Sequence, residues 1–431
     1  MITKQLIDKI EGEASITFEM QEKHVAFATI SFANFRGMES LLRGKNGLDA
    51  LVFTPRVCGI CGHAHLMATV RALEDAYANA GYPITLTNKA AQIREFTLGM
   101  EMVQNHLKWI YLTLLPELQK LGSSIKQAPL KAAFGSSLAS KAIALLAGQW
   151  PHSSYMIPGG ITADPTYIEI LQAGGFVEEL ILFIEKELLG VCIEEFLAFE
   201  SCKDLNTLTS DLSSIEKELI AFGMQTKGFA YDRFVVMGEH GFSQKAKLKH
   251  TRSFGVDPRY VTVEDAYDPY EKSYAKNALY KGEFYETGPL ARMMAQQIPL
   301  IKNIHRRFKD SAYARVIARI YELPFMLKHM RELLKGIVVS EDSFIAPHRL
   351  KEISAEGVGV VEAPRGPLLH RVELQQGIIQ KYEIITPTQW NIGSGAKEKP
   401  TPAQTAMVGL SQEEALFVFR TFDVCSVCTT H

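Results

Sequence analysis

The chain has 431 residues, of which 47% are hydrophobic, 10% aromatic and 22% charged. This composition is close to the globular average and excludes a disordered, collagen-like or disulfide-scaffold protein. Lysine and arginine total 46 against 48 acidic residues, which gives a formal net charge of -2. We therefore expect no nucleic-acid partner, because nothing indicates a basic binding face.

The sequence gives little indication of a membrane or export segment. No stretch reaches the roughly 18 uninterrupted apolar residues that a spanning helix needs, and the most hydrophobic region, Phe176 to Phe199, is interrupted by charged residues. Residues 1–13 are rich in charge and contain no apolar core of a secretory signal. We expect a cytoplasmic protein without a direct membrane span, which reaches a membrane or is exported only through a partner.

Sequence periodicity predicts a small N-terminal sheet followed by many helices. Apolar and polar residues alternate over 14–33 around the segment 21–24, as in a hairpin. Helical spacing follows in five stretches, namely 66–77, 93–118, 167–199, 212–222 and 290–338. Glycine, proline and β-branched residues predict short strands and loops at 223–263 and 356–387. An exposed loop is expected at 393–402, before a last helix that starts near Ser411.

These elements predict an α+β fold that is predominantly helical, with a central helix bundle and small peripheral β-sheets. We expect one large domain in three parts. Residues 1–65 carry the hairpin and a first cysteine motif, residues 66–340 form a mainly helical body, and residues 341–431 hold strands, loops and a second cysteine motif.

Four of the six cysteines form two Cys-x-x-Cys pairs at opposite ends of the chain, Cys58 with Cys61 and Cys425 with Cys428. If all four bind one centre, the two ends of the chain must meet in the fold. Four thiolates suit zinc, iron-sulfur iron or nickel, since soft ligands select these metals over magnesium or calcium.

The spacing alone leaves alternatives open. A structural four-cysteine zinc site is one of them. A thioredoxin-like dithiol fits less well, because it expects a single pair beside a βαβ pattern. A histidine also follows each pair, His65 and His431, and a closed four-thiolate site would not require either of them.

The two cysteine segments resemble the paired signature motifs of the large subunit of nickel-iron hydrogenases. These segments read Arg-Val-Cys-Gly-Ile-Cys at 56–61, with His65 beyond, and Asp-Val-Cys-Ser-Val-Cys-Thr-Thr-His at 423–431. Four more stretches are similar to the family's motifs: Lys-Ile-Glu-Gly at 9–12, Arg-Gly-Met-Glu at 36–39, Glu-Ala-Pro-Arg-Gly at 362–366 and Thr-Pro-Thr-Gln-Trp-Asn at 386–391. The resemblance thus runs from residue 9 to residue 431 and implies a hydrogenase large-subunit fold.

The resemblance implies a set of metal ligands. Cys58, Cys61, Cys425 and Cys428 would hold nickel, with Cys61 and Cys428 also bridging to an iron that carries carbon monoxide and two cyanides. Glu39, His431 and the backbone carbonyl of Ile384 would bind magnesium near the iron.

Other roles follow from the same resemblance. Arg365 would lie over the metal pair, Pro364 and Thr388 would lie near the cyanides, and Glu11 would relay protons from Cys425. Physical chemistry is consistent with this, because a buried anionic centre needs a compensating cation, and a terminal thiolate can accept a proton and, as a thiol, pass it to a carboxylate beside it.

The remaining cysteines, Cys192 and Cys202, cannot ligate a four-cysteine cluster. Electrons are therefore expected to pass to a small subunit that carries iron-sulfur clusters, in a heterodimer or a dimer of heterodimers. We expect Cys192 and Cys202 to be buried small hydrophobes and His63 to be only a neighbour of the first motif. His106 is equally consistent with a core histidine and with a residue next to the site.

Three residues depart from the family pattern. Val424 stands where the motif usually has proline, Trp109 where many members have histidine, and Glu117 where an aspartate is expected near the site.

The expected reaction is the reversible cleavage of dihydrogen into protons and electrons. The alternatives are a hydrogen sensor that turns over slowly and, in a different class, the structural zinc protein.

Overall fold

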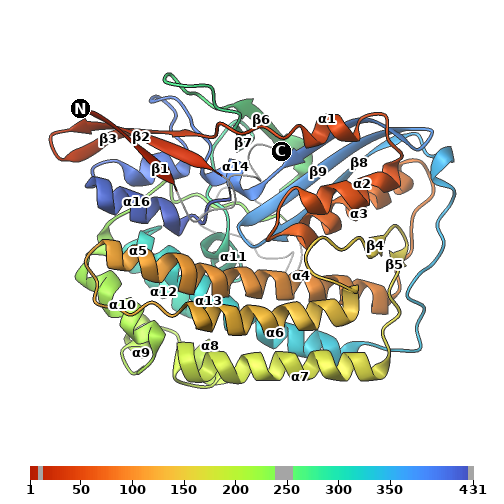
Figure 1. The fold of residues 1–431 in the computed structure, drawn as a ribbon, viewed down its shortest axis with the longest axis horizontal. Coiled ribbons are helices and arrows are strands. Elements are labelled where there is room, and N and C mark those ends of the chain that lie inside the picture. Colours follow the sequence, from red (N-terminus) through yellow and green to blue (C-terminus); the bar gives the residue numbers. More distant parts are fainter. Residues whose placement is uncertain (8–12, 238–255, 426–431) are drawn as a thin grey trace.

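A computed structural model describes residues 1–7, 13–237 and 256–425 of the chain (Figure 1). Glu11, Cys428 and His431 lie outside these described residues. The architecture is α+β and predominantly helical, as predicted, with helices packed beneath two three-stranded sheets in the view of Figure 1.

The N-terminal sheet has the order β1-β2-β3, with β1 at Ile2–Ile7, β2 at Ala14–Gln21 and β3 at His24–Ser31. Strands β2 and β3 form the predicted antiparallel hairpin. Its polar turn contains Glu22, at a φ of 54°. Val25 exchanges backbone hydrogen bonds with Gly409 and Leu410, so the hairpin is fixed to the segment between α15 (Pro402–Met407) and α16 (Gln412–Thr421).

The second sheet, in the order β10-β9-β8, packs closely against one helix. Its strands are β8 at Ala355–Ala363, β9 at Gly366–Gln375 and β10 at Ile378–Ile385, and the helix is α3 at Gly62–Asn79. A Cβ atom on Gly357 or Gly359 would lie 2.0 or 1.9 Å from a backbone oxygen of α3, so only glycine allows this approach. The contact fixes the start of α3 relative to the turn between β8 and β9.

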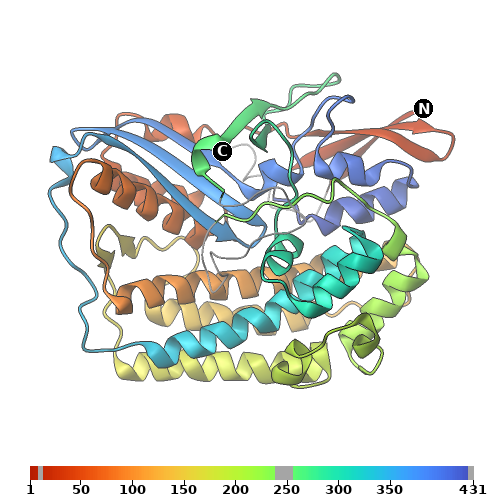
Figure 2. The same cartoon turned by 180° about the vertical axis from the view of Figure 1, so that it is seen from behind.

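The helical layer contains α4 (Asn88–Lys108), α6 (Pro129–Ala147), α7 (Tyr167–Ile184) and α13 (Ala312–Gly336), and Figure 2 shows it from the opposite side. The predicted helix 93–118 is continuous but changes pitch. A π-helical segment, Trp109–Leu114, follows α4 and leads into α5 at Leu115–Lys120. Trp109 thereby lies at a helix irregularity of the kind often found near functional sites.

The predicted stretch 290–338 divides into three helices, α11 (Pro289–Ala295), α12 (Pro299–Phe308) and α13. Prolines at the first positions of α11 and α12 start new helices there, since proline fits an N-terminal turn but not a helix interior. The predicted stretch 167–199 is also divided. Helix α7 is followed by a π-helical segment at Glu185–Leu189 and then by the short helix α8 at Ile193–Leu197.

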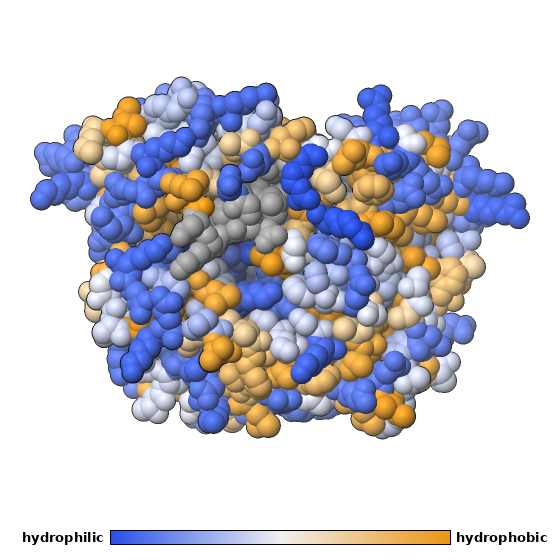
Figure 3. Space-filling view, in the orientation of Figure 1, coloured by the Kyte–Doolittle hydropathy of each residue, from blue (hydrophilic) through white to orange (hydrophobic). Residues whose placement is uncertain are grey.

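Helix α6 is absent from the sequence predictions because its many alanines and serines give little apolar contrast. In the described part of the chain it is the one helix long and apolar enough to cross a membrane by length and composition, and 50% of the relevant window is buried. It packs between α4 and α7 as a bundle helix. Figure 3 shows apolar side chains at the surface in this lower region, where α6 and α7 expose Leu130, Phe134, Ile168 and Leu182.

The predicted exposed loop 393–402 is partly wrong, because Gly393, Ser394 and Gly395 are buried. The Ser394 hydroxyl accepts a hydrogen bond from the Ile30 amide of β3 at 3.3 Å, which draws the loop against the N-terminal sheet. The other elements are α1 (Met38–Leu42), α2 (Ala50–Phe53), α9 (Cys202–Leu205), α10 (Asp211–Ala221), α14 (Pro387–Asn391), β4 (Met156–Ile157), β5 (Gly160–Ile161), β6 (Val261–Asp265) and β7 (Lys276–Tyr280).

Candidate metal centre

The first cysteine pair lies in a tight turn that ends where α3 begins. Cys61 is the residue directly before α3, and Cys58 and Cys61 are 1% and 5% exposed. The Ile60 amide donates to the Cys58 sulfur at 3.5 Å. A Cβ on Gly62 would lie 2.9 Å from the Pro55 carbonyl oxygen, so the chain can close this turn only with glycine there. Both sulfurs are thus presented by a rigid, buried segment.

The second motif reaches the same place from the other end of the chain. After α16 ends, Asp423 adopts a left-handed φ of 60°, and Cys425 is completely buried. The sulfur atoms of Cys58 and Cys425 lie 3.6 Å apart. The structure therefore brings together the described cysteines of both motifs, while Cys428 falls outside the described residues.

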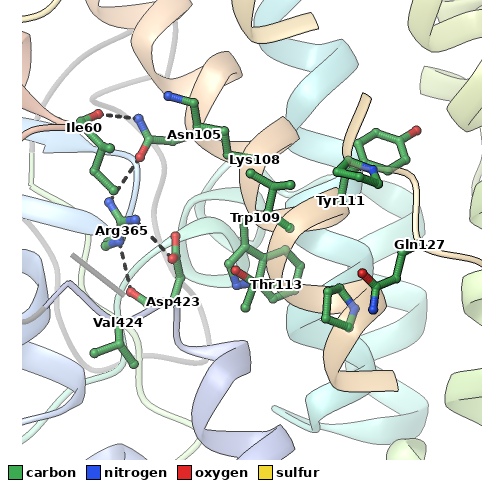
Figure 4. Close-up of a pocket in the computed structure, with 13 residues that line it drawn as sticks. Ile60, Asn105, Lys108, Trp109, Tyr111, Thr113, Gln127, Arg365, Asp423 and Val424 are labelled. Atoms are coloured by element: carbon green, nitrogen blue, oxygen red, sulfur yellow. Dashed lines mark hydrogen bonds and ion pairs between the residues drawn. The ribbon is translucent and has the colours of Figure 1, made fainter. Parts of the chain in front are cut away.

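Arg365 is fixed beside these thiols by three hydrogen bonds (Figure 4). Its Nε and one terminal nitrogen donate to the carbonyl and carboxylate oxygens of Asp423, at 3.0 and 3.1 Å. Its other terminal nitrogen donates to Oδ1 of Asn105 at 3.2 Å. Burial alone would lower the pKa of Arg365, but the negative charges of Asp423 and the neighbouring cysteines raise it. The guanidinium is a permanent buried cation that faces the thiols.

A cavity of about 460 Å³ extends from this arginine to the surface. Arg365, Asp423 and Val424 line its inner end, and the exposed residues Gln127 and Pro129 lie at its outer end. Ile60, Trp109 and Leu112 contribute apolar walls. Val424, the replacement for proline in the family motif, thus forms part of the cavity wall.

The predicted cyanide neighbours, Pro364 and Thr388, are both buried. The Thr388 hydroxyl is buried and makes no hydrogen bond with any described residue, which is costly unless a further acceptor is supplied. Pro364 is fixed through its carbonyl, which accepts from Arg292 at 2.9 Å. An acceptor ligand such as cyanide would satisfy the threonine.

The predicted magnesium ligands Glu39 and Ile384 are in contact. The Ile384 amide donates to Oε1 of Glu39 at 2.8 Å, and the ammonium of Lys276 lies 3.8 Å from Oε2. His431, the third predicted ligand, is outside the described residues. The contact uses the Ile384 amide, whereas the predicted ligand is its carbonyl, so the pairing is compatible with that role without testing it.

His65, which follows the first cysteine pair, contacts another histidine. Its Nδ1 lies 3.1 Å from Nε2 of His370 on β9, and Thr69 connects this pair to Tyr382. Among the described residues, no group of three or more His, Cys, Asp or Glu side chains could hold a metal ion. Cys428 and His431 of the predicted ligand set lie outside the described residues.

Three residues that contact Arg365 or the first motif were missed or given no role in the sequence analysis. Asn105 bridges Arg365 and the first motif, since its Nδ2 donates to the Ile60 carbonyl at 2.6 Å. Asp423 belongs to the second motif and holds Arg365. Glu101, one helical turn before Asn105, accepts from the amides of His63 and Ala64 at 3.0 and 3.1 Å. Only its position near His106 in the sequence could have indicated Glu101.

Burial shifts the pKa of Glu101 and the pKa values of two nearby histidines in opposite directions. It raises the pKa of Glu101 to about 8, although the amide donors of α3 partly oppose this. It lowers the pKa of His63 to about 4 and that of His106 to about 4. His63 is packed beside Tyr155 at the start of α3, as expected for a neighbour of the motif.

Two expectations outside the site need correction. Cys192 is exposed and Cys202 is half-buried, so neither is a core residue, and the Cys202 sulfur contacts Arg307 at 2.9 Å. They lie at the starts of the short helices α8 and α9, where chain ends are less covered than in a bundle helix. Glu117, where the family pattern has an aspartate, lies 3.7 Å from Arg420 and 3.0 Å from the ammonium of Lys120.

The fold and geometry define a class, a mainly helical α+β protein in which buried cysteines of two distant motifs meet. The model of the nickel-dependent hydrogenase family matches residues 36–116 and 181–431, which is more than half of the chain. The chain therefore belongs to the nickel-dependent hydrogenase family, and the prediction of a hydrogenase large subunit is confirmed.

Relatives and solved structures agree with this assignment. The chain is 25% identical to the periplasmic [NiFeSe] hydrogenase large subunit of Desulfomicrobium baculatum, over 89% of this chain and 84% of that protein. It is 26% identical to the coenzyme F420 hydrogenase subunit alpha of Methanothermobacter thermautotrophicus, over 98% and 92%. The Ni-Fe-Se hydrogenase structure from Desulfovibrio vulgaris Hildenborough superposes with a TM-score of 0.83 at 21% identity, covering 100% of both chains.

Proposed function

We propose that this chain cleaves dihydrogen reversibly at a nickel-iron centre held by Cys58, Cys61, Cys425 and Cys428, with carbon monoxide and two cyanides on the iron. The observation that carries the proposal is the 3.6 Å approach of the Cys58 and Cys425 sulfurs beside the buried Arg365 guanidinium. When bound, the metal pair supplies the heterolytic cleavage of dihydrogen. Nickel follows from the family, and soft thiolates are suitable ligands for it.

The protein groups around the site suit such a centre. Thiolates and cyanides would give it a net negative charge, which is costly to bury without a counter-charge. Arg365 supplies a fixed cation, and the Thr388 hydroxyl supplies an otherwise unsatisfied donor. The cavity lined by Ile60 and Trp109 gives a molecule as small as dihydrogen a route from the surface.

Glu11 is proposed to accept the proton from Cys425 and pass it outward. Glu11→Gln retains the shape of the side chain but cannot cycle between carboxylate and carboxylic acid. The variant should keep nickel, iron and the infrared bands of the diatomic ligands, yet lose most exchange between deuterium gas and solvent protons. Glu13→Gln is the matched control, since Glu13 is exposed and its carboxylate accepts a hydrogen bond from Asn34 at 3.4 Å. Wild-type exchange in Glu11→Gln would remove Glu11 from the proton path.

Magnesium is proposed to bind between Glu39, the Ile384 carbonyl and His431, because carboxylate and carbonyl oxygens suit this ion. The Glu39 contact with the Ile384 amide supports the placement of these residues at one site.

The proposed partner is a small subunit with iron-sulfur clusters. Related proteins are named as large subunits or as subunit alpha, and a large subunit implies a smaller companion. Such a partner would carry electrons away. Together with this chain it would form a heterodimer or a dimer of heterodimers. Purification of the native complex, followed by iron and sulfide analysis of each subunit, tests this proposal.

A cytoplasmic location is retained as a proposal for this chain, although one relative is named as periplasmic. The names of several relatives also mention selenium. In this chain all four motif positions are cysteine, so sulfur ligation is proposed throughout.

A further inference from the structure

The inference concerns His106, a residue to which the catalytic proposal assigns no role. The inference itself rests on that proposal. His106 lies on α4, directly after Asn105, and is completely buried. It lies between two groups of buried charges. On one side are Glu322 and Arg292, and on the other side are Arg319 and Asp423.

The contacts of the imidazole define its protonation. Its Nδ1 lies 3.2 Å from a terminal nitrogen of Arg319, and this guanidinium can only donate. Nδ1 must therefore be the acceptor. Nε2 lies 2.8 Å from Oε2 of Glu322 and carries the hydrogen that it donates. His106 is thus a neutral imidazole whose Nε2–H tautomer is fixed by its two partners.

The acceptor at Nδ1 contributes to the orientation of Arg319. The same terminal nitrogen of Arg319 also donates to Oδ2 of Asp423 at 2.9 Å. The guanidinium is further stacked on Trp109, with 4.7 Å between its carbon and the ring centre. Asp423 in turn binds Arg365 through its other carboxylate oxygen and its carbonyl. The chain of contacts from His106 therefore ends at the guanidinium that faces the cysteines.

The opposite side of His106 is anchored independently. Both carboxylate oxygens of Glu322 accept from Arg292, each at 2.7 Å. Arg292 also donates to the carbonyls of Ala363 and Pro364, each at 2.9 Å, next to Arg365 in the chain. The Glu322 side therefore keeps its strong ion pair without His106, whereas Arg319 depends on His106 for its second described acceptor.

We propose that His106 is a positioning residue that holds Arg319 against Asp423 and thereby fixes the orientation of Arg365 over the metal centre. Its effect depends on the acceptor at Nδ1, while the donor at Nε2 anchors the ring.

Two variants separate these atoms. His106→Asn places an amide oxygen near the position of Nδ1 and retains an acceptor for Arg319. His106→Gln places an amide near Nε2 and retains a donor for Glu322, but loses the acceptor. Both variants remove one hydrogen bond and part of a ring, so a purely structural role predicts similar losses.

The experiment measures deuterium–proton exchange, nickel content, infrared bands and thermal unfolding of the native complex. With nickel retained, His106→Gln should lose about tenfold or more in exchange, and its diatomic-ligand bands should shift or broaden because Arg365 is no longer held in one orientation. His106→Asn should lose about threefold or less.

The control variant is His329→Gln. His329 on α13 pairs with Glu95 on α4 at 2.6 Å, so it has the same chemistry between the same two helices without a contact at the site. It should keep wild-type exchange and wild-type infrared bands.

Equal losses in the two His106 variants, or losses that merely follow the unfolding temperature across all three variants, would overturn the proposal. If His106→Gln fails to assemble, Arg319→Lys tests the same link, because lysine keeps the charge but cannot reproduce the planar guanidinium. Wild-type exchange and bands in Arg319→Lys would also overturn it. Failure of the catalytic proposal is distinguishable, since the wild-type complex itself would then lack nickel and the bands.

Discussion

The two cysteine segments are held in the same site by different forces. The turn from Cys58 to Cys61 is fixed by hydrogen bonds to backbone groups, from Asn105 to the Ile60 carbonyl and from the amides of α3 to Glu101. The segment from Asp423 to Cys425 is held by two buried arginines, Arg319 and Arg365, that share the Asp423 carboxylate. The first segment is therefore ordered mainly by hydrogen bonds between its backbone and side chains of α4, and the second depends on balanced charge.

This difference matters because backbone hydrogen bonds and buried ion pairs fail differently. Removal of one neutral hydrogen bond costs about 0.5–1.5 kcal/mol, whereas one unpaired buried charge costs about 3–5 kcal/mol. We therefore expect the second segment to be more sensitive to single substitutions that remove a charge. The following predictions test this contrast.

The largest effect is expected when a proposed ligand itself is removed. Cys61→Ser should abolish nickel binding and all exchange activity, because serine is a hard ligand that bridges nickel and iron poorly. Metal analysis of the purified complex measures this. Cys192→Ser is the matched control, since Cys192 is exposed and lies outside the site, and it should retain full nickel. Full nickel in Cys61→Ser would contradict the proposed ligand set.

On the charged side, Asp423→Asn leaves Arg319 and Arg365 without their shared counter-charge. We expect a loss of about 3–5 kcal/mol in the free energy of unfolding, together with lower nickel occupancy. Urea unfolding measures the loss. Asp257→Asn removes a surface carboxylate that pairs with the exposed Arg259 and should leave the stability nearly unchanged. Similar results for the two variants would show that the second segment does not depend on buried charge.

The contributions of His106, beside the second segment, and Glu101, beside the first segment, to the free energy of unfolding should change with pH in opposite directions. The pKa of His106 is lowered by burial to about 4 in the folded protein, so the unfolded chain binds the extra proton between about pH 4 and pH 6.5. The stability advantage of the wild type over His106→Asn should therefore shrink as the pH falls through this window, by on the order of 3 kcal/mol.

Glu101, on the side of the first segment, should show the reverse. Burial raises its pKa to about 8, so the folded protein binds the extra proton and loses this stability as the pH rises from about 4.5 to 8. The advantage of the wild type over Glu101→Gln should shrink in that direction. Urea unfolding at a series of pH values measures both differences, and equal signs would refute the assignment.

The smallest effect is expected for Asn105→Ala, because Arg365 keeps its counter-charge, Asp423, in this variant. It removes hydrogen bonds to the Ile60 carbonyl and to Arg365, and we expect a loss of about 1–2 kcal/mol. Asn79→Ala is the control, since Asn79 is exposed on α3 and should lose less. A loss in Asn105→Ala as large as that in Asp423→Asn would remove the contrast between the two segments.

The sequence was sufficient for features that local pattern determines. The β2–β3 hairpin follows from strict alternation, and the approach of Cys58 to Cys425 was predicted on the condition that both motifs bind one centre. Helix α6 was missed because alanine and serine obscure the apolar period. The exposure of Cys192 was also missed, because it depends on how the start of α8 packs against its neighbours.

The charged network could not be predicted, because its members come from distant parts of the chain. Arg292, Glu322 and His106 lie on three different helices, and each alone would usually be a surface or core residue. Only the tertiary packing of α4, α11 and α13 shows that they are buried together. The contact of Asn105 with Arg365 could not be predicted for the same reason, since the two residues lie far apart in the sequence.

The central claim is a nickel-iron centre held by four thiolates where the two motifs meet. Metal analysis combined with infrared spectroscopy of the native complex tests it most directly. We predict about one nickel per chain and infrared bands from carbon monoxide and cyanide on iron. Stoichiometric zinc, with no bands from diatomic ligands, would contradict the account and would favour a structural four-cysteine site instead.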